Sequence, residues 1–267
     1  MNTIQQEITR MLSDAGQLPV ASTSKEPGAY ERRQVERWNQ KQGTLKGIDC
    51  PKCKNRGYIF RYDAERDVIF QDECSCMELR RSEQRMKASG ISESMERCTF
   101  DGYKAVEPWQ IKAKGIVMSW SKKPSGWLWV GGQVASGKTH LCTAALRELA
   151  KTFPVSYMMW RDDSARIKAQ INDLEGIEQL DRFKKSKVLY IDDLFKGGAP
   201  SEADLRLAFE IVNYRYNRTE LIAIISSEWF LSELVELDEA IGSRINERSR
   251  GNRVEIKRDK ARNYRLR

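Results

Sequence analysis

Short apolar runs alternate with longer helix-compatible segments over the second half of the chain. The runs are Trp127–Val130, Val155–Trp160, Val188–Ile191, Leu221–Ser226 and Arg253–Ile256. Continuous apolar runs of this length are typical of strands that are buried on both faces. Because helical segments separate most of them, the pattern predicts βαβ units and an α/β fold with a parallel sheet covered on both faces.

The first part of the chain follows a different pattern. An apolar stripe with the spacing of one helix face is formed by Ile4, Ile8, Met11 and Leu12. A loop with Gly, Pro and Ser follows, and residues 30–42 are polar and helix-compatible. We expect these segments to form an N-terminal helical arm over residues 1–48. They are either surface helices of their own domain or a docking arm for a partner.

The pattern then changes to that of a hairpin. Aromatic and β-branched residues occupy Tyr58–Tyr62 and Val68–Phe70, and a short polar segment separates them. This predicts a β-hairpin within a module over residues 49–78. A linker helix over 79–98 is expected to lead into a sheet-forming domain over 99–267.

The composition is that of a globular protein. Of the 267 residues, 40% are hydrophobic and 31% are charged, which does not fit wholesale disorder. No apolar run reaches about 18 residues, the length of a membrane span, and no signal peptide opens the sequence. We therefore expect a cytoplasmic protein without membrane contact. The single histidine, His140, argues against a catalytic triad and a poly-histidine metal site.

The net charge of +8 suggests a polyanionic partner, but the charge is unevenly distributed. Residues 241–267 hold 10 Lys and Arg against 3 Asp and Glu, so this segment carries +7 of the total. Its arginines are candidates to bind the phosphates of ATP as well as those of a nucleic acid.

A complete G-x-x-x-x-G-K-[ST] motif follows the first apolar run and precedes a helical segment. The motif and the adjoining histidine comprise Gly132, Gln133, Val134, Ala135, Ser136, Gly137, Lys138, Thr139 and His140. In this context the backbone N–H groups cradle phosphate oxygens, the lysine reaches the β- and γ-phosphates, and the threonine binds Mg²⁺. We therefore predict an ATP site.

Polar residues end two of the other predicted strands. Asp192 and Asp193 follow Val188–Ile191, where a Mg²⁺-binding acid belongs. We assign Asp192 to Mg²⁺ and Asp193 to the attacking water. Ser226 is the candidate to sense the γ-phosphate, with Ser227 as the second choice.

Arginines near the end of the sequence could complete such a site. Arg244 and Arg248 are spaced to share one helical face, where either could reach the γ-phosphate of a neighbouring subunit. The alternative is a solvated basic face. Arg265 could approach the nucleotide of its own chain.

Four cysteines have the spacing C-x₂-C-x₂₀-C-x-C. They are Cys50, Cys53, Cys74 and Cys76, and four thiolates provide a tetrahedral zinc site. Because protein would fill all four positions, the zinc is expected to be structural. The alternative is four reduced, unligated cysteines; disulfides are not expected in the cytoplasm.

Taken together, the P-loop, the Asp-Asp and Ser-Ser strand ends and the Ser-Arg-Ile-x-x-Arg segment resemble the AAA+ ATPases that load replicative helicases, the DnaC/DnaI type. The segment 99–103 resembles the linker into the core of that family, and phage and mobile-element members belong to it. The likeness covers residues 99–267. It implies an AAA+ core, Arg244 as arginine finger and Arg265 as a second-sensor arginine.

The resemblance also implies partners. The hexameric replicative helicase would bind through residues 1–97, single-stranded DNA would bind the ATPase domain with helices over 161–187, and subunits would self-associate. The family often has Asp-Glu where this chain has Asp192-Asp193, which is consistent with slow, switch-like hydrolysis. Two alternatives stay open: a transposition helper ATPase of the IstB type, and a zinc-dependent adaptor whose P-loop only senses nucleotide.

Overall fold

The computed structural model describes residues 27–88 and 91–266, and the chain divides into two compact units, residues 1–74 and 75–267. The helix expected around Ile4 to Leu12 lies outside the described residues. Within them, no helix is long and apolar enough to cross a membrane.

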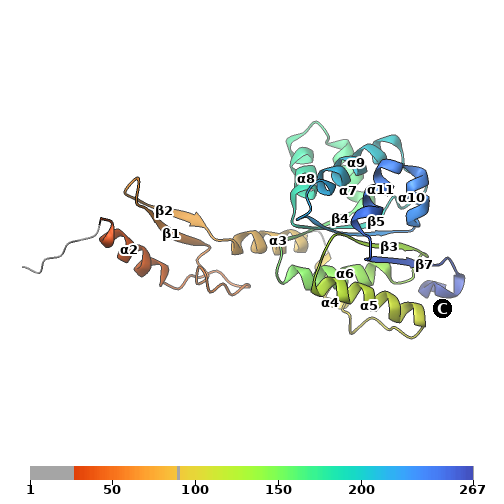
Figure 1. Cartoon of the computed structure of the whole chain (residues 1–267), viewed down its shortest axis with the longest axis horizontal. Coiled ribbons are helices and arrows are strands. Elements are labelled where there is room, and N and C mark those ends of the chain that lie inside the picture. The colour runs from red at the N-terminus through yellow and green to blue at the C-terminus, as the bar shows by residue number, and fades with distance from the viewer. Residues whose placement is uncertain (1–26, 89–90, 267) are drawn as a thin grey trace, which may run out of the picture. The chain divides into compact units, whose positions relative to one another are not determined.

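The described part of the first unit, residues 27–74, contains one helix and one hairpin (Figure 1). Helix α2 (Ala29–Asn39) packs on strand β1 (Tyr58–Asp63), which pairs with strand β2 (Val68–Glu73) in an antiparallel hairpin. The Asn39 amide bonds both backbone groups of Phe60, at 2.9 and 3.0 Å. The predicted hairpin and the predicted helix over 30–42 are therefore confirmed.

The second unit is a parallel sheet between two layers of helices. Its strands are β3 (Leu128–Gly132), β4 (Val155–Met159), β5 (Val188–Leu194), β6 (Ile222–Ser227) and β7 (Arg253–Ile256). Its helices are α3 (Cys76–Ala88), α4 (Ile91–Arg97), α5 (Pro108–Lys122), α6 (Lys138–Ala150), α7 (Trp160–Ala169), α8 (Leu174–Lys185), α9 (Glu202–Tyr216), α10 (Leu231–Leu237) and α11 (Glu239–Arg248), followed by the 3₁₀ turns η1 (Lys260–Arg262) and η2 (Tyr264–Leu266).

The strand order β4-β5-β6-β3-β7 places the P-loop strand β3 between β6 and β7. Every pair in this sheet is parallel. Alternate residues of each strand enter different cores, because side chains alternate between the faces of a sheet. On β5, Leu189 and Ile191 face the layer of α7 to α11, whereas Val188 and Tyr190 face α5 and α6. The predicted α/β fold with a doubly covered parallel sheet is confirmed.

The segment expected to be a linker helix differs from the expectation. It forms two helices, α3 and α4, which belong to the second unit. The Ser82 hydroxyl on α3 bonds the backbone N–H and C=O of Val155 at 2.8 and 2.7 Å, so it covers one end of the edge strand β4. Polar composition alone did not reveal this contact, since the buried face of α3 is small.

Arg215 on α9 is buried and connects two backbone segments, residues 183–186 and the start of β6. Its guanidinium donates to the carbonyl oxygens of Phe183, Lys184, Ser186 and Ile222, at 2.6–3.1 Å. Burial lowers the pKa of Arg215 to about 9. The cation therefore satisfies carbonyl groups at the end of α8 and at the start of β6 that would otherwise lack donors.

Candidate functional site

The P-loop joins β3 to α6 and has the backbone conformation that its glycines permit. Gly132 and Gly137 have φ values of 102° and 91°. A Cβ atom at Gly137 would lie 2.9 Å from a ring carbon of Tyr103, and one at Gly132 would lie 2.2 Å from the carbonyl oxygen of Ile256. Both glycines are therefore required by conformation and by space.

Lys138 opens α6 and is buried inside the loop. Its Nζ donates to the carbonyl oxygens of Gly132 and Gln133, at 3.0 and 2.7 Å. Burial lowers its pKa, an effect that the nearby carboxylates of Asp193 and Glu228 partly offset. An ammonium that is desolvated in this way gains from an anionic ligand in the cleft.

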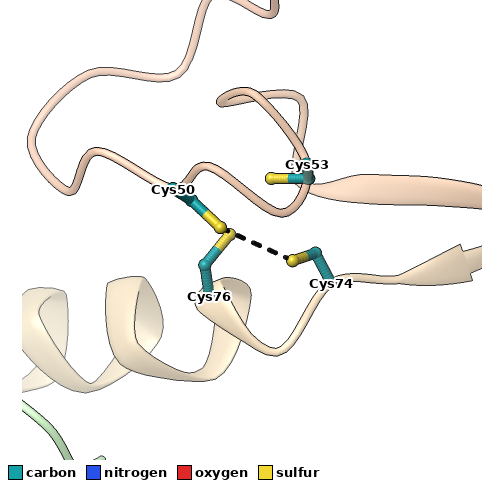
Figure 2. Close-up of side chains that lie close together, drawn as sticks. All are labelled: Cys50, Cys53, Cys74 and Cys76. Carbon is teal, nitrogen blue, oxygen red and sulfur yellow. Dashed lines mark hydrogen bonds between the residues drawn. The ribbon is translucent and has the colours of Figure 1, made fainter. Parts of the chain in front are cut away.

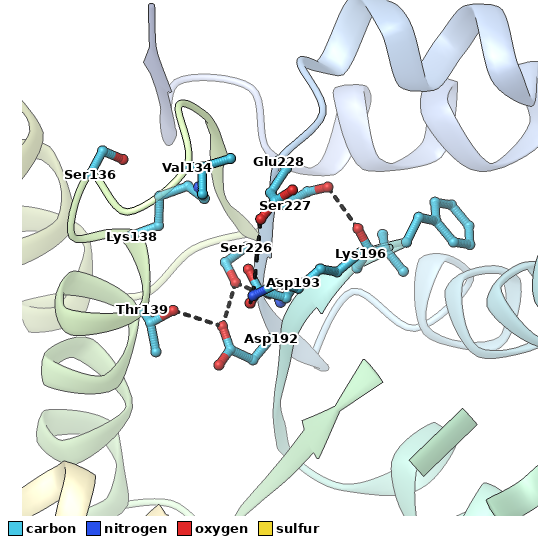
Figure 3. A network of polar contacts seen from close by, with 12 residues as sticks. Val134, Ser136, Lys138, Thr139, Asp192, Asp193, Lys196, Ser226, Ser227 and Glu228 are labelled. Atoms are coloured by element: carbon cyan, nitrogen blue, oxygen red, sulfur yellow. Dashed lines mark hydrogen bonds and ion pairs between the residues drawn. The ribbon is translucent and has the colours of Figure 1, made fainter. Parts of the chain in front are cut away.

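Asp192 lies under the P-loop and accepts hydrogen bonds from hydroxyl groups (Figure 3). The donors are Thr139 at 3.3 Å, Tyr157 at 3.1 Å, Tyr190 at 2.5 Å and Ser226 at 2.6 Å. The carboxylate therefore has a fixed orientation toward the first turn of α6. Paired oxygen donors from Thr139 and Asp192 fit Mg²⁺, which prefers oxygen ligands, and the other hydroxyls would orient the carboxylate.

The position of Ser226 differs from the one expected for a γ-phosphate sensor. Its hydroxyl is fully buried and also accepts a 2.9 Å hydrogen bond from the backbone N–H of Asp193. It therefore positions the two acids instead of lining the cleft. Ser227 is equally buried, and its hydroxyl donates to the carbonyl oxygen of Leu194.

A cleft of about 410 Å³ opens over the loop. Its P-loop side is formed by residues 134–140. The remaining lining residues are Gly102, Tyr103, Lys104, Asp193, Lys196, Glu228, Tyr264 and Arg265. The structure thus brings together Lys138, Thr139, His140, Asp193 and Arg265 of the predicted site.

Several of these lining residues carry no local motif and were not predicted. Tyr103 and Tyr264 come from opposite ends of the second unit, and the backbone N–H of Tyr264 donates to the carbonyl oxygen of Ala135 at 2.9 Å. His140 is held by the carbonyl oxygen of Thr99, 2.8 Å from its Nε2. In the sequence, only segment 99–103 and the predicted role of Arg265 pointed to this side of the cleft.

Carboxylates and one ammonium face the P-loop from the opposite side. Lys196 Nζ lies 2.5 Å from Asp193 Oδ2 and 4.0 Å from Glu228 Oε1. The hydrogen bond to Asp193 raises the pKa of Lys196, so it stays protonated. Asp193 has φ of 56°, a conformation that costs energy for a residue with a side chain.

The predicted trans-acting arginines lie on α11. Arg244 is not among the described residues that line the cleft of its own chain; its guanidinium donates to Asn213 Oδ1 at 3.2 Å and to the Ala240 carbonyl oxygen at 2.7 Å. Arg248 donates to the carbonyl oxygens of Thr219 and Leu221, at 3.1 and 3.3 Å. Arg248 therefore holds α11 against the segment that precedes β6.

The four predicted cysteines form one cluster (Figure 2). Their sulfur atoms all lie within 4.8 Å of one another and all four residues are buried. Sulfurs that bind one zinc ion at about 2.3 Å are about 3.8 Å apart, and those of Cys50 and Cys74 are separated by 3.8 Å. The Gly57 N–H points at the Cys53 sulfur, 3.4 Å away. The donor set fits a structural zinc ion.

Known proteins resemble both the sequence and the fold. The phage-like element PBSX protein XkdC of Bacillus subtilis is 35% identical over 217 residues, which cover 74% of this chain and 79% of XkdC. The Bacillus subtilis protein YqaM is 30% identical over 82% of this chain and 86% of YqaM. No family model matches the sequence.

Solved structures share the fold of the second unit. The DnaC helicase loader matches with a TM-score of 0.53 at 20% identity, over 63% of this chain and 100% of that chain. DnaI matches with a TM-score of 0.51 at 23% identity, over 62% and 93%. DnaA from Aquifex aeolicus with bound AMPPCP matches with a TM-score of 0.50 at 20% identity, over 61% and 50%. The chain therefore belongs to the family of XkdC and YqaM, and its P-loop unit has the AAA+ fold of the DnaC and DnaI helicase loaders.

Proposed function

We propose that the chain is an ATP-dependent loader that places the hexameric replicative DNA helicase on single-stranded DNA at replication initiation. The observation that carries the proposal is the cleft, in which a complete P-loop, the Thr139–Asp192 pair and Arg265 meet within the fold of a known helicase loader. The relationship to a protein of a phage-like element supports a member carried by a phage or mobile element.

The arrangement of residues in the cleft supports a role in ATP hydrolysis. Backbone N–H groups of the P-loop and Lys138 would bind the phosphates. Mg²⁺ held by Thr139 and Asp192 would neutralise charge on the β- and γ-phosphates. Asp193 would orient and deprotonate the attacking water, and Arg265 would stabilise negative charge on the γ-phosphate.

We further propose that two subunits complete each ATP site. Arg244 is half-exposed on α11, away from its own cleft, and would reach the nucleotide of a neighbour in trans. ATP would favour assembly and DNA engagement, and hydrolysis would favour release. This subunit arrangement supplies the charge stabilisation that an arginine finger gives.

The proposed partners use different parts of the chain. Residues 1–97 would bind the helicase, with structural zinc in the four-cysteine cluster stabilising that part. Single-stranded DNA would contact the helices over 161–187, where Arg161 and Arg166 are exposed and Lys168 pairs with Asp204 at 2.5 Å. These activities would place the protein in the cytoplasm.

The first test is ATP turnover by purified protein. Lys138→Ala should lower hydrolysis at least about 100-fold, since the lysine would stabilise charge on the transferred phosphate. Lys151→Ala is the matched control, because the exposed Lys151 follows the same helix and pairs with Glu148. Equal hydrolysis by the Lys138→Ala variant and the wild type would contradict an ATPase at this P-loop.

The second test is co-purification with the replicative helicase, with and without ATP. A complex that depends on residues 1–97 would support loading, and no complex under either condition would count against it. Binding to duplex DNA and a transposase instead would favour the IstB-type alternative. A partner complex that is indifferent to nucleotide, in a protein that does not hydrolyse ATP, would favour the adaptor.

A further inference from the structure

Lys196 lies between the nucleotide cleft and a second hollow of about 190 Å³, and both open at the carboxyl ends of the strands. The second hollow is lined by Arg161 and Lys168 of α7 and by the segment from Phe195 to Pro200. Among the described residues, Lys196 alone borders both cavities. Its ammonium can therefore contact groups in either of them.

In the structure the Lys196 ammonium lies in the nucleotide cleft. Its Nζ lies 2.5 Å from Oδ2 of Asp193, the carboxylate assigned to the attacking water. The ammonium occupies one acceptor position of this carboxylate, so a water molecule at that position would have to displace it. The side chain is about one-third exposed, so it has room to leave.

The backbone around Lys196 is fixed on one side and open on the other. Before it, a turn runs from Asp193 to Lys196, closed by a 3.0 Å hydrogen bond from the Lys196 N–H to the Asp193 carbonyl oxygen. After it, Gly197 and Gly198 have φ values of 110° and 121°, and a Cβ at either would meet no atom within 4 Å. Only the glycine side of the turn can move without repacking the core.

We infer that Lys196 is a positioning residue that restrains Asp193, and that phosphates of a nucleic acid strand in the second hollow draw the ammonium off the carboxylate. The inference rests on the proposed function, because it concerns hydrolysis in the same cleft. Arg161 and Lys168 add positive charge to that hollow, where Asp204 already pairs with Lys168. DNA binding would in this way release the water-activating acid.

The test measures steady-state ATP hydrolysis by the full chain, with and without a 20-nucleotide oligothymidine as probe. Lys196→Met should raise kcat about tenfold without DNA, equal to about 1.4 kcal/mol, with little change in KM. The oligonucleotide should stimulate the wild type and add little to the Lys196→Met variant. Lys196→Arg keeps a cation at this position and should behave like the wild type.

Lys151→Met is the matched control. It removes one lysine and one ion pair of the same i,i+3 spacing, Lys151–Glu148 at 2.6 Å, on the exposed end of α6. It should leave the rate unchanged. If the loss of any lysine charge raised the rate, kcat would change equally in Lys196→Met and Lys151→Met. That result would overturn the inference.

The remaining outcomes separate this inference from the proposed function. If the wild type hydrolyses ATP and Lys196→Met is equal or slower, the restraint is overturned and the ATPase stands. A wild type that ignores the oligonucleotide overturns the release route. If neither protein hydrolyses bound ATP, the proposed function and the restraint both fail. Hydrolysis that appears only in Lys196→Met supports the restraint most directly.

Discussion

The hydroxyl of Ser226 joins the two acids at the end of β5, because it donates to Asp192 at 2.6 Å and accepts from the backbone N–H of Asp193 at 2.9 Å. One buried hydroxyl therefore orients the proposed Mg²⁺ ligand and fixes the backbone of the proposed water-activating residue.

Replacing Ser226 by Ala should weaken the apparent affinity for Mg²⁺ more than the affinity for nucleotide. Loss of a group that orients a metal ligand costs about 10- to 100-fold in metal affinity. We expect the Mg²⁺ concentration for half-maximal hydrolysis to rise about tenfold, while nucleotide binding without Mg²⁺ is preserved. The exposed Ser232 supplies the control variant, Ser232→Ala. An unchanged Mg²⁺ titration would show that Ser226 does not position Asp192.

Mixing two inactive variants tests whether Arg244 acts across a subunit boundary. Arg244→Ala should bind ATP yet hydrolyse it about 10³-fold more slowly, as in other arginine-finger systems. Lys138→Ala should be inactive because its own P-loop is impaired. A mixture of the two should regain part of the activity, since a subunit with an intact P-loop can receive Arg244 from its neighbour. No recovery at concentrations where the chains associate would favour a role within one chain.

Zinc content tests the cysteine cluster. The wild type should contain one zinc ion per chain, and Cys53→Ser should lose it because three thiolates and a hydroxyl bind zinc more weakly. Cys98→Ser is the control, since Cys98 lies outside the cluster. Elemental analysis after gel filtration measures both variants. Full zinc occupancy in Cys53→Ser would contradict the proposed ligand set.

Arg215→Ala should destabilise the second unit strongly. It would leave four carbonyl oxygens without their donor, and we expect a loss of about 3 kcal/mol or more in the free energy of unfolding. Arg206→Ala on the same helix removes only an exposed ion pair with Glu202, which should cost below about 0.5 kcal/mol. Urea unfolding compares the two. Similar midpoints would show that water replaces Arg215 at no cost.

The strands, the P-loop and the cysteine ligands could be predicted because each depends on a local pattern. An apolar run of four to six residues specifies a buried strand wherever it pairs, and the spacing Gly132 to Thr139 specifies a phosphate loop. The two acids near the end of β5 followed from the same logic, since strand ends of a parallel sheet meet at one edge.

The rest of the cleft depends on contacts between distant segments. Nothing around Lys196 or Glu228 in the sequence indicates that they face Lys138, because the turn after β5 and the end of β6 meet only in the folded sheet. The structural use of the basic surplus also depends on distant contacts. Arg248 and Arg253 donate to backbone carbonyl oxygens of their own chain, and Arg258 pairs with Glu233, so much of that charge is used within the fold.

The tie between Tyr264 and Ala135 has a consequence for the timing of synthesis. The P-loop strand β3 needs β7 as its neighbour, and the loop itself is held by residues that follow β7. A growing chain on the ribosome therefore carries an unfinished nucleotide cleft until residues 253–265 have left the exit tunnel. Before that point the proposed ATP site would be incomplete, so a nascent chain would not consume ATP prematurely.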